Sequence, residues 1–208
     1  MFKNRKDAAY KLAEKLVKYK NSDGIVMAIP RGGVEIGYVL ATELDMFLDV
    51  VMIKKIGHPK NPEYAVGSVS LYGRILDHHY DVTQEYIEEE TKKIRKLLKE
   101  RHEEYLRGRS PFEIKGKTVI LADDGIATGN TLFAAIHTIK KSEPAEIIVA
   151  APLAPAEVVE KLREIVDDVV VEEIPKSFYG VGQFYEDFKP VSDEEAVRLL
   201  RDFNHVQV

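Results

Sequence analysis

Two adjacent aspartates, Asp123 and Asp124, follow an apolar run and precede a turn of small residues at 125–131. The turn holds two glycines and two threonines, Thr128 and Thr131, and it leads into a segment with helical periodicity. Hydroxyl groups and the free N–H groups of a helix N-terminus bind phosphate, and glycine lets the backbone approach closely. Neighbouring carboxylates suit sugar hydroxyls or hydrated Mg²⁺. The segment therefore predicts a site that holds a phosphate and a ribose side by side.

A second candidate anion site is the turn Pro30-Arg31-Gly32-Gly33, which follows the apolar run 24–29. Its two glycines allow successive N–H groups to point at one anion, and Arg31 can add a bidentate contact to phosphate oxygens. Other phosphate motifs fit less well. The Walker A motif fails because Gly125 and Gly129 are one residue too close and Asn130 stands where a lysine is needed. The G-x-G-x-x-G spacing of dinucleotide-binding proteins is also absent.

Two lysines, Lys54 and Lys55, end the second apolar run at 48–53. Adjacent side chains of a strand point to opposite faces, so we expect one of the two to face the ligand. The polar segment that follows is rich in Gly and Pro, and we expect it to form a surface loop at about 56–66.

Alternating apolar runs and helical patterns must position these residues. The runs expected to form strands are 24–29, 48–53, 66–71, 119–122, 146–151 and 169–171. Helices are expected at 5–20, 34–44, 83–106 and 131–141, from Pro155 to near 165, and after an S-x-x-E capping box at 192–195. Continuous apolar strands separated by helices indicate a doubly wound α/β fold, with a mainly parallel sheet and flanking helices. Such sheets bind ligands beyond the carboxyl ends of their strands.

The composition limits the classes of protein to consider. The chain has 208 residues, a net charge of −5 and no cysteine. The length indicates a single domain over residues 1–208, and the missing cysteine excludes thiolate chemistry and disulfides. The acidic balance disfavours nucleic acid as a partner, and the absence of a long apolar run argues against a membrane. We expect a soluble, cytoplasmic protein.

The segments VILADDGIATGNT and AIPRGGVEIG resemble the type I phosphoribosyltransferase family. The first resembles its signature for phosphoribosyl pyrophosphate (PRPP): four apolar residues, two acids and a Thr-Gly-x-Thr loop. KKIGHPKNPEYAVGSV and VGQFYEDF extend the resemblance to a subgroup whose acceptor is unassigned. The resemblance implies a glycosyltransferase of nucleotide metabolism. Its reaction would be Mg²⁺-dependent transfer of 5-phosphoribosyl from PRPP to a nucleobase-like acceptor, with release of pyrophosphate.

The resemblance also implies roles for individual residues. The catalytic residues would be Asp123, Asp124, Arg31, Lys54 and Lys55, and the two aspartates would meet Mg²⁺ mostly through water or PRPP hydroxyls. The residues expected to bind PRPP are Arg31, Gly32, Gly33, Asp123, Asp124, Gly125, Ala127, Thr128, Gly129, Asn130 and Thr131. The segment 56–66 would be the mobile loop that closes over PRPP, and a homodimer is compatible with the family.

An aromatic cluster at 178–188 lies within the candidate hood, residues 172–190, which would cover the acceptor. A flat heteroaromatic ring could stack there. The candidate acceptor contacts are Tyr179, Gln183, Phe184, Tyr185, Glu186 and Asp187, and ordinary packing is the alternative for each of them.

One departure from the family pattern and two alternative interpretations bear on this assignment. Ala127 stands where 6-oxopurine enzymes of the family carry an aspartate, which argues against hypoxanthine and guanine as acceptors. The protein could also sense PRPP or a nucleotide without turnover, in which case we expect no acceptor pocket. A metal site at Asp77-His78-His79-Tyr80-Asp81 is disfavoured because adjacent histidines on a strand diverge.

Overall fold

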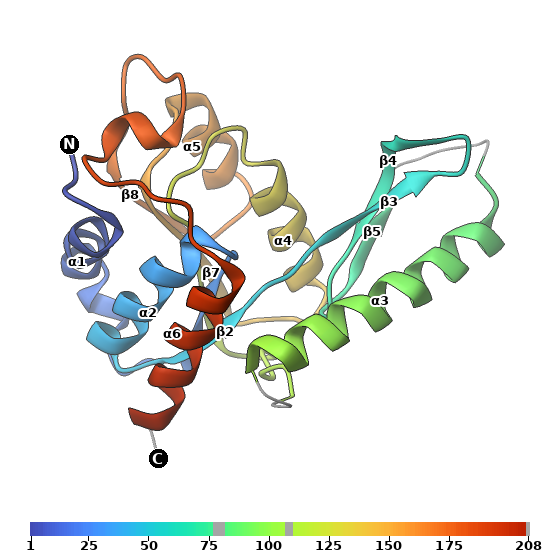
Figure 1. Ribbon diagram of the computed structural model, residues 1–208, viewed down its shortest axis with the longest axis horizontal. Coiled ribbons are helices and arrows are strands. Elements are labelled where there is room, and N and C mark those ends of the chain that lie inside the picture. The colour runs from blue at the N-terminus through green and yellow to red at the C-terminus, as the bar shows by residue number, and fades with distance from the viewer. Residues whose placement is uncertain (77–81, 107–109, 207–208) are drawn as a thin grey trace.

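The computed structural model describes residues 1–76, 82–106 and 110–206, with all side chains in these ranges except those of residues 63 and 204–206. The body is a five-stranded parallel sheet in the order β2-β1-β6-β7-β8 (Figure 1). Its strands are β1 (Gly24–Ala28), β2 (Phe47–Val50), β6 (Thr118–Ala122), β7 (Glu146–Leu153) and β8 (Asp168–Glu173). Among the described residues, no helix has the length and hydropathy needed to cross a bilayer.

Helices cover both faces of this sheet, as the continuous apolar strands predict. Alternate side chains of β1 enter two separate cores: Val26 and Ala28 join one, and Ile25 and Met27 join the other. The first core includes α1 (Arg5–Lys15), α2 (Gly32–Leu44) and α6 (Asp193–Val206), and the second includes α4 (Asn130–Lys140) and α5 (Ala156–Arg163). The expected doubly wound α/β fold is therefore confirmed.

The chain order places a topological switch point between β1 and β6. From β1 the chain proceeds outward to β2, and it later returns to add β6, β7 and β8 on the other side of β1. The helices that follow β1 and β6 lie on opposite faces of the sheet. A crevice consequently opens beyond the carboxyl ends of these two strands, which is where open α/β sheets bind ligands.

A separate arm projects from the side of the body (Figure 1). It contains an antiparallel sheet of β3 (Lys54–His58), β4 (Asn61–Val69) and β5 (Arg74–Leu76), packed on the long helix α3 (Gln84–Leu106). The hydroxyl group of Tyr86 on α3 donates to the carbonyl oxygen of Gly57 at 2.8 Å, and Ile56 is fully buried. The arm is thus held by its own side-chain contacts.

The arm corrects two sequence predictions. Lys54 and Lys55 do not end the second strand of the body: β2 ends at Val50, and the two lysines begin β3. The apolar run predicted that the strand continues to residue 53. Val51 and Met52 are apolar because they are buried in the connection that leaves the sheet, although they lie beyond the end of β2. The segment 56–66, expected to be a loop, is most of the β3–β4 hairpin.

A buried pair of side chains joins the arm to the body. Asp49 of β2 and His102 of α3 are both almost fully buried, and Asp49 Oδ1 lies 2.9 Å from His102 Nε2. The second carboxylate oxygen of Asp49 accepts the backbone N–H of Phe112 at 3.0 Å. The C-terminal part of α3 is therefore tied to the edge strand of the body.

A helix cap and two short 3-10 helices complete the secondary structure near the chain ends. The backbone N–H of Glu195 donates to Ser192 Oγ at 3.1 Å, so the predicted cap at the start of α6 is confirmed. A short 3-10 helix, η1 (Val17–Tyr19), follows α1, and another, η2 (Val181–Phe184), lies within the candidate hood. The hood is otherwise irregular after β8.

Candidate active site

Two of the predicted ligand-binding segments meet at the switch point. Ala28 of β1 pairs with Ala122 of β6, so the Pro30–Gly33 turn and the acidic pair begin at the same level of the sheet edge. A Cβ atom on Gly33 would lie 2.8 Å from the carbonyl oxygen of Ala122, and one on Gly32 would overlap the carboxylate of Asp124. Only glycine allows this close packing of the turn on the end of β6.

The turn presents a charged side chain at the start of a helix. The peptide bond between Pro30 and Arg31 is cis, and α2 begins at Gly32. Arg31 is exposed. The hydrogen bond from Tyr105 lowers the pKa of Asp193 at the start of α6, and the charge of Arg31 makes a smaller contribution in the same direction. The charge of Arg31 therefore acts toward the start of α6, while the N-terminus of α2 lies beside the acidic pair, where Gly32 packs on Asp124.

The two aspartates have different surroundings. Asp123 Oδ1 accepts the backbone N–H of Asp124 at 2.9 Å, and burial, reinforced by the charge of Asp124, raises the pKa of Asp123 well above its ordinary value. Asp124 Oδ2 instead accepts Nε–H of Arg5 at 2.7 Å. One carboxylate of the pair therefore has a cationic partner, while the other keeps a carboxylate neighbour.

Sequence reasoning missed Arg5. This arginine is the first residue of α1, and its side chain is only 7% exposed. Asn4 caps the helix by accepting the backbone N–H of Asp7, so the local pattern around Arg5 is that of an ordinary polar helix start. Nothing in that pattern indicates that Arg5 is buried against Asp124.

The loop after the acidic pair encloses a cavity at the place where the sequence predicts a phosphate cradle. This cavity of about 170 Å³ is lined by Asp123 and by residues 125–132. Gly129 has φ 74° and caps α4, so the loop enters the helix through a left-handed conformation that favours glycine. Thr128 and Thr131 are exposed beside the helix N-terminus. The residues at 125–131 thus surround one small cavity.

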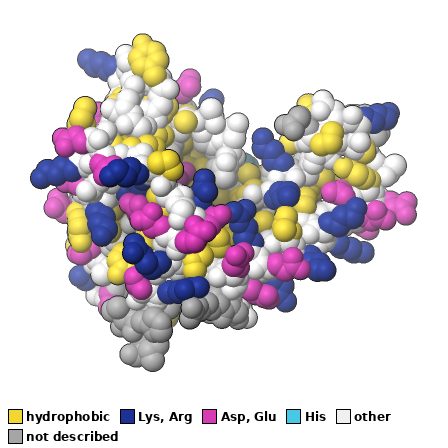
Figure 2. Space-filling view, viewed as in Figure 1, with side chains coloured by type: hydrophobic (Ala, Val, Ile, Leu, Met, Phe, Trp, Pro, Cys, Tyr) yellow, Lys and Arg dark blue, Asp and Glu magenta, His cyan; other side chains and the backbone are white. Residues whose placement is uncertain are grey.

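The two lysines lie away from this cavity in the arm. Lys54 and Lys55 pair with Val69 and Ser68 of β4, and both side chains are exposed. In the described part of the chain, neither lysine lines the cavity beside Asp123. Figure 2 shows an open hollow between the body and the arm, with Lys and Arg side chains around it. Any contact of these lysines with a ligand would therefore be made from the arm.

The candidate acceptor residues separate into buried and exposed groups. Tyr185 is buried, its ring stacks on Phe188, and its hydroxyl group donates to the carbonyl oxygen of Asp124 at 2.7 Å. Tyr185 therefore supports the acidic pair and has no free ring face for a base. Phe184 is partly buried and stacks on Phe178. The exposed candidates are Tyr179, Gln183, Glu186 and Asp187.

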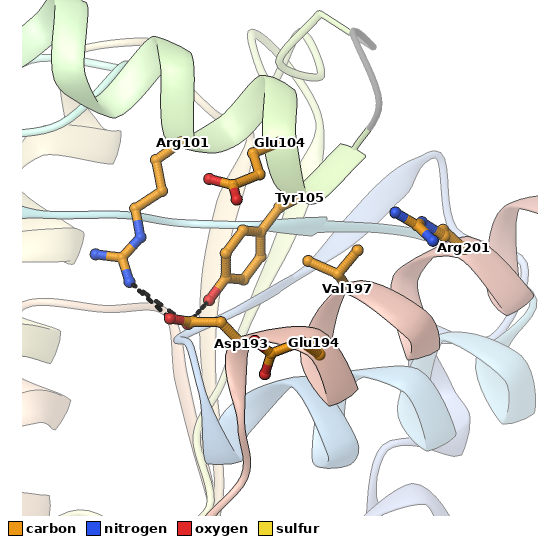
Figure 3. A pocket seen from close by; sticks show the side chains of 7 residues that line it. All are labelled: Arg101, Glu104, Tyr105, Asp193, Glu194, Val197 and Arg201. Atoms are coloured by element: carbon orange, nitrogen blue, oxygen red, sulfur yellow. Dashed lines mark hydrogen bonds and ion pairs between the residues drawn. The ribbon is translucent and has the colours of Figure 1, made fainter.

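The structure also contains a pocket that the sequence did not predict. It has a volume of about 270 Å³ and lies between the end of α3 and the start of α6 (Figure 3). The hydroxyl group of Tyr105 and the guanidinium of Arg101 both donate to Asp193. Burial raises the pKa of Tyr105 to about 12. These contacts join the arm helix to α6, next to the Arg31 turn.

Metal-ligating groups are sparse near the site. The Asp77–Asp81 segment lies outside the described residues, so the structure does not place its histidines. Among the described residues, no cluster of three or more His, Asp or Glu side chains could hold a metal ion. The carboxylates at the site are the adjacent pair Asp123 and Asp124.

The parallel sheet with helices on both faces, and the loops that meet beyond the ends of β1 and β6, define an α/β domain whose candidate ligand site lies at the switch point. The chain belongs to the family described as phosphoribosyl transferase domain, which matches residues 2–189. It is 36% identical to TT1426 from Thermus thermophilus, whose crystal structure superimposes with a TM-score of 0.84 over 97% of this chain and 98% of that one.

Two curated relatives come from strains of Mycobacterium tuberculosis. They are named "Putative phosphoribosyl transferase MT0597" and "Putative phosphoribosyl transferase Rv0571c", and each is 33% identical over 214 residues. The match covers 98% of this chain and 48% of each relative. The chain therefore spans about half the length of these curated relatives.

Proposed function

We propose that this domain binds PRPP and transfers its 5-phosphoribosyl group to a nucleobase-like acceptor, releasing pyrophosphate. The observation that carries the proposal is the meeting of three features at the switch point. These are the cavity at 125–131, the carboxylate of Asp123 on its wall, and the Pro30–Gly33 turn packed on Asp124. Phosphate, ribose and pyrophosphate are joined in that order in PRPP, so each feature has a part of the ligand to hold.

Each group of the site has a physical role in this reaction. The N–H groups at the start of α4 and the hydroxyls of Thr128 and Thr131 would bind the 5-phosphate. Asp123 would accept hydrogen bonds from the ribose hydroxyls. Arg31 and the N-terminus of α2 would stabilise the negative charge that grows on pyrophosphate as its bond to C1 breaks. The reaction needs positioning and charge stabilisation, and no protein nucleophile is required.

The acidic pair fits a magnesium ion carried by the substrate rather than a closed protein site. Asp123 and Asp124 offer oxygen donors, the type that Mg²⁺ prefers, yet one oxygen of Asp124 is already paired with Arg5. The remaining ligands would come from water and from PRPP. When bound, Mg²⁺ would neutralise negative charge on the diphosphate, while the protein holds the ribose and the leaving group in place.

The acceptor would lie between the phosphoribosyl group and the hood. The exposed hood residues Gln183, Glu186 and Asp187 offer polar groups that could recognise the edge of a base. Tyr179 is 91% exposed and would have to change its surroundings in order to stack on a base. The acceptor class is therefore left to a screen over many bases.

Calorimetry with PRPP and Mg²⁺ tests the binding step. Thr128→Val removes a hydroxyl from the cradle, and Gly129→Val places a side chain at φ 74° and against Phe133. Both variants should weaken PRPP binding severely. Thr42→Val is the matched control, because Thr42 is exposed on α2 and its hydroxyl bonds only its own helix. Undiminished binding by both site variants would refute the assignment.

A pyrophosphate-release assay with a panel of bases tests the transfer step. Release that requires PRPP, Mg²⁺ and one class of base supports the transferase. Tight PRPP binding without release by any base would instead favour a protein that senses PRPP.

A further inference from the structure

The buried guanidinium of Arg5 connects three segments that are far apart in the sequence. Its Nε–H donates to Asp124 Oδ2 at 2.7 Å, and its Nη1–H donates to the carbonyl oxygen of Lys189 at 2.8 Å. The guanidinium group also lies over the ring of Phe188, 4.0 Å from the centroid. One cation therefore contacts the acidic pair and the end of the hood at the same time.

The N-terminal segment holds the hood against this cation. The backbone N–H of Phe2 donates to the carbonyl oxygen of Phe184, and Glu186 N–H donates back to Phe2 at 2.9 Å. Asp187 N–H donates to the carbonyl oxygen of Lys3 at 3.0 Å. Residues 2 and 3 thus pair with the hood as a short strand would, and Arg5 follows two residues later.

Asp124 is restrained from three sides. Arg5 holds its carboxylate, the Tyr185 hydroxyl donates to its carbonyl oxygen at 2.7 Å, and Gly32 packs against Oδ2. Asp123 also lies against the turn, since its Oδ1 would be 3.4 Å from a Cβ atom on Gly33, but it lines the cavity at 125–131 and Asp124 does not. The two carboxylates therefore differ: Asp123 borders both the turn and the cavity, and Asp124 is held by Arg5 beneath Gly32.

The charges around Arg5 favour a role beyond packing. Three carboxyl groups lie near this cation: Asp123, Asp124 and Glu35 of α2, whose pKa is raised by burial and lowered in part by Arg5. Without a cation, the two adjacent aspartates would repel each other in a partly buried position. A neutral residue at position 5 would leave Asp124 without its ion partner and free to move away from the turn.

We infer that Arg5 is a positioning residue of the PRPP site. Arg5 holds Asp124 under the Pro30–Gly33 turn, and because it also contacts the end of the hood, the order of the hood and the geometry of the acidic pair depend on each other. The inference rests on the proposed function for its ligand, although the linkage itself is a property of the protein alone. Arg5 does not line the cavity at 125–131, so it acts through Asp124 and the hood.

The test compares Arg5→Met and Arg5→Lys with wild type by two measurements. These are amide hydrogen exchange over residues 178–188 and calorimetric binding of PRPP with Mg²⁺. Arg5→Met should speed exchange in the hood and weaken PRPP binding about 10-fold or more, as expected when a buried charge pair loses one partner. Arg5→Lys keeps the charge but not the planar fork, so it should restore part of each property.

Lys15→Met is the matched control, because Lys15 lies on the same helix and forms an ion pair with Glu172 of β8 at 2.8 Å. It should leave both measurements as in wild type. If Arg5→Met is less stable but keeps the wild-type hood exchange and the wild-type PRPP affinity, Arg5 is only a structural residue and the inference is wrong.

Phe188→Leu gives a second test if Arg5→Met does not fold. This change removes the ring under the guanidinium and leaves both of its hydrogen-bond partners in place. Hood amides should exchange faster and PRPP should bind a few-fold more weakly, whereas wild-type values for both would overturn the inference. If wild-type protein itself fails to bind PRPP, the proposed function fails, and hood exchange still decides whether Arg5 orders the hood.

Discussion

A Cβ atom placed on Gly32 would overlap Oδ2 of Asp124, so the turn after β1 and the acidic pair after β6 are in direct contact. Arg5 Nε would lie 3.1 Å from the same Cβ atom. The position thus has no room for a side chain while Asp124 keeps its ion pair. This contact makes the candidate pyrophosphate turn and the candidate ribose site a single unit.

Gly32→Ala should therefore damage binding more than folding. The added methyl group must displace either the turn or the Asp124 carboxylate, and misplacement by about 1 Å can cost about 100-fold in a positioned site. We expect PRPP affinity to fall about 10- to 100-fold, measured by calorimetry. Thr42→Val on the same helix is the control, because Thr42 is exposed and its hydroxyl donates to the carbonyl oxygen of Tyr38. Equal affinities for the two variants would contradict the prediction.

The raised pKa of Asp123 predicts how stability depends on pH. A carboxyl with a higher pKa in the folded state binds more protons there than in the unfolded chain, so its contribution to stability is present at low pH and is lost as pH rises through the folded pKa. Asp123→Asn keeps an oxygen for the Asp124 N–H and removes the titration. The variant should gain stability relative to wild type as pH rises above about 4, the ordinary pKa of an aspartate, in urea unfolding.

The same variant should lose function. If Asp123→Asn shows the predicted stability gain and also retains full PRPP-dependent turnover, the carboxylate has no role in the ligand site. A stability difference that stays constant with pH would show that the pKa of Asp123 is not raised in the folded protein.

The buried pair Asp49 and His102 predicts a large effect of a remote substitution. His102→Leu leaves a fully buried carboxylate without one of its partners, and such a loss costs about 1.5–3 kcal/mol. Urea unfolding should show a fall of this size in the free energy of unfolding. His137→Leu is the control, because His137 is exposed on α4. Similar effects of both changes would mean that the pair adds little to stability.

Ala127 predicts poor use of hypoxanthine and guanine. An acceptor nitrogen would find no carboxylate at this exposed position of the loop, so its proton would have to be managed by water, by pyrophosphate or by a hood carboxylate such as Glu186. Steady-state kinetics should give values of kcat/KM below ~10⁴ M⁻¹s⁻¹ for both bases. Ala127→Asp should raise these values if the position meets the base. Wild-type values at or above that limit would show that alanine is no exclusion signal.

Local sequence patterns were sufficient to predict the strands at the centre of the parallel sheet. The apolar runs at 24–29, 119–122 and 146–151 predicted β1, β6 and β7, because strands buried on both faces require apolar side chains throughout. The small-residue turn at 125–131 also predicted a helix from residue 131, and α4 begins at Asn130. A turn and the cap of the helix it enters are consecutive in the chain, so short-range residue types determine them.

The arm was predicted less well. Its lysines and its Gly/Pro-containing segment have the composition of a surface loop, yet residues 54–69 form a β-hairpin packed on α3. The hairpin is stabilised by burial of Ile56 and Val66 and by the Tyr86 contact, and these partners come from another part of the chain. Local hydropathy does not encode such partners, because tertiary packing decides whether a weakly apolar segment pairs as strands.

The sequence by itself determined the parallel sheet, the order of its helices and the residue types of the loop at 125–131, since each follows from periodicity or from neighbouring residues. Only the tertiary structure decided that Arg5 pairs with Asp124, across 119 positions of the chain. It also decided that Tyr185 supports the acidic pair and that Lys54 and Lys55 belong to the arm. A buried charge or hydroxyl takes the partner that packing brings within hydrogen-bond distance, and no local pattern specifies that partner.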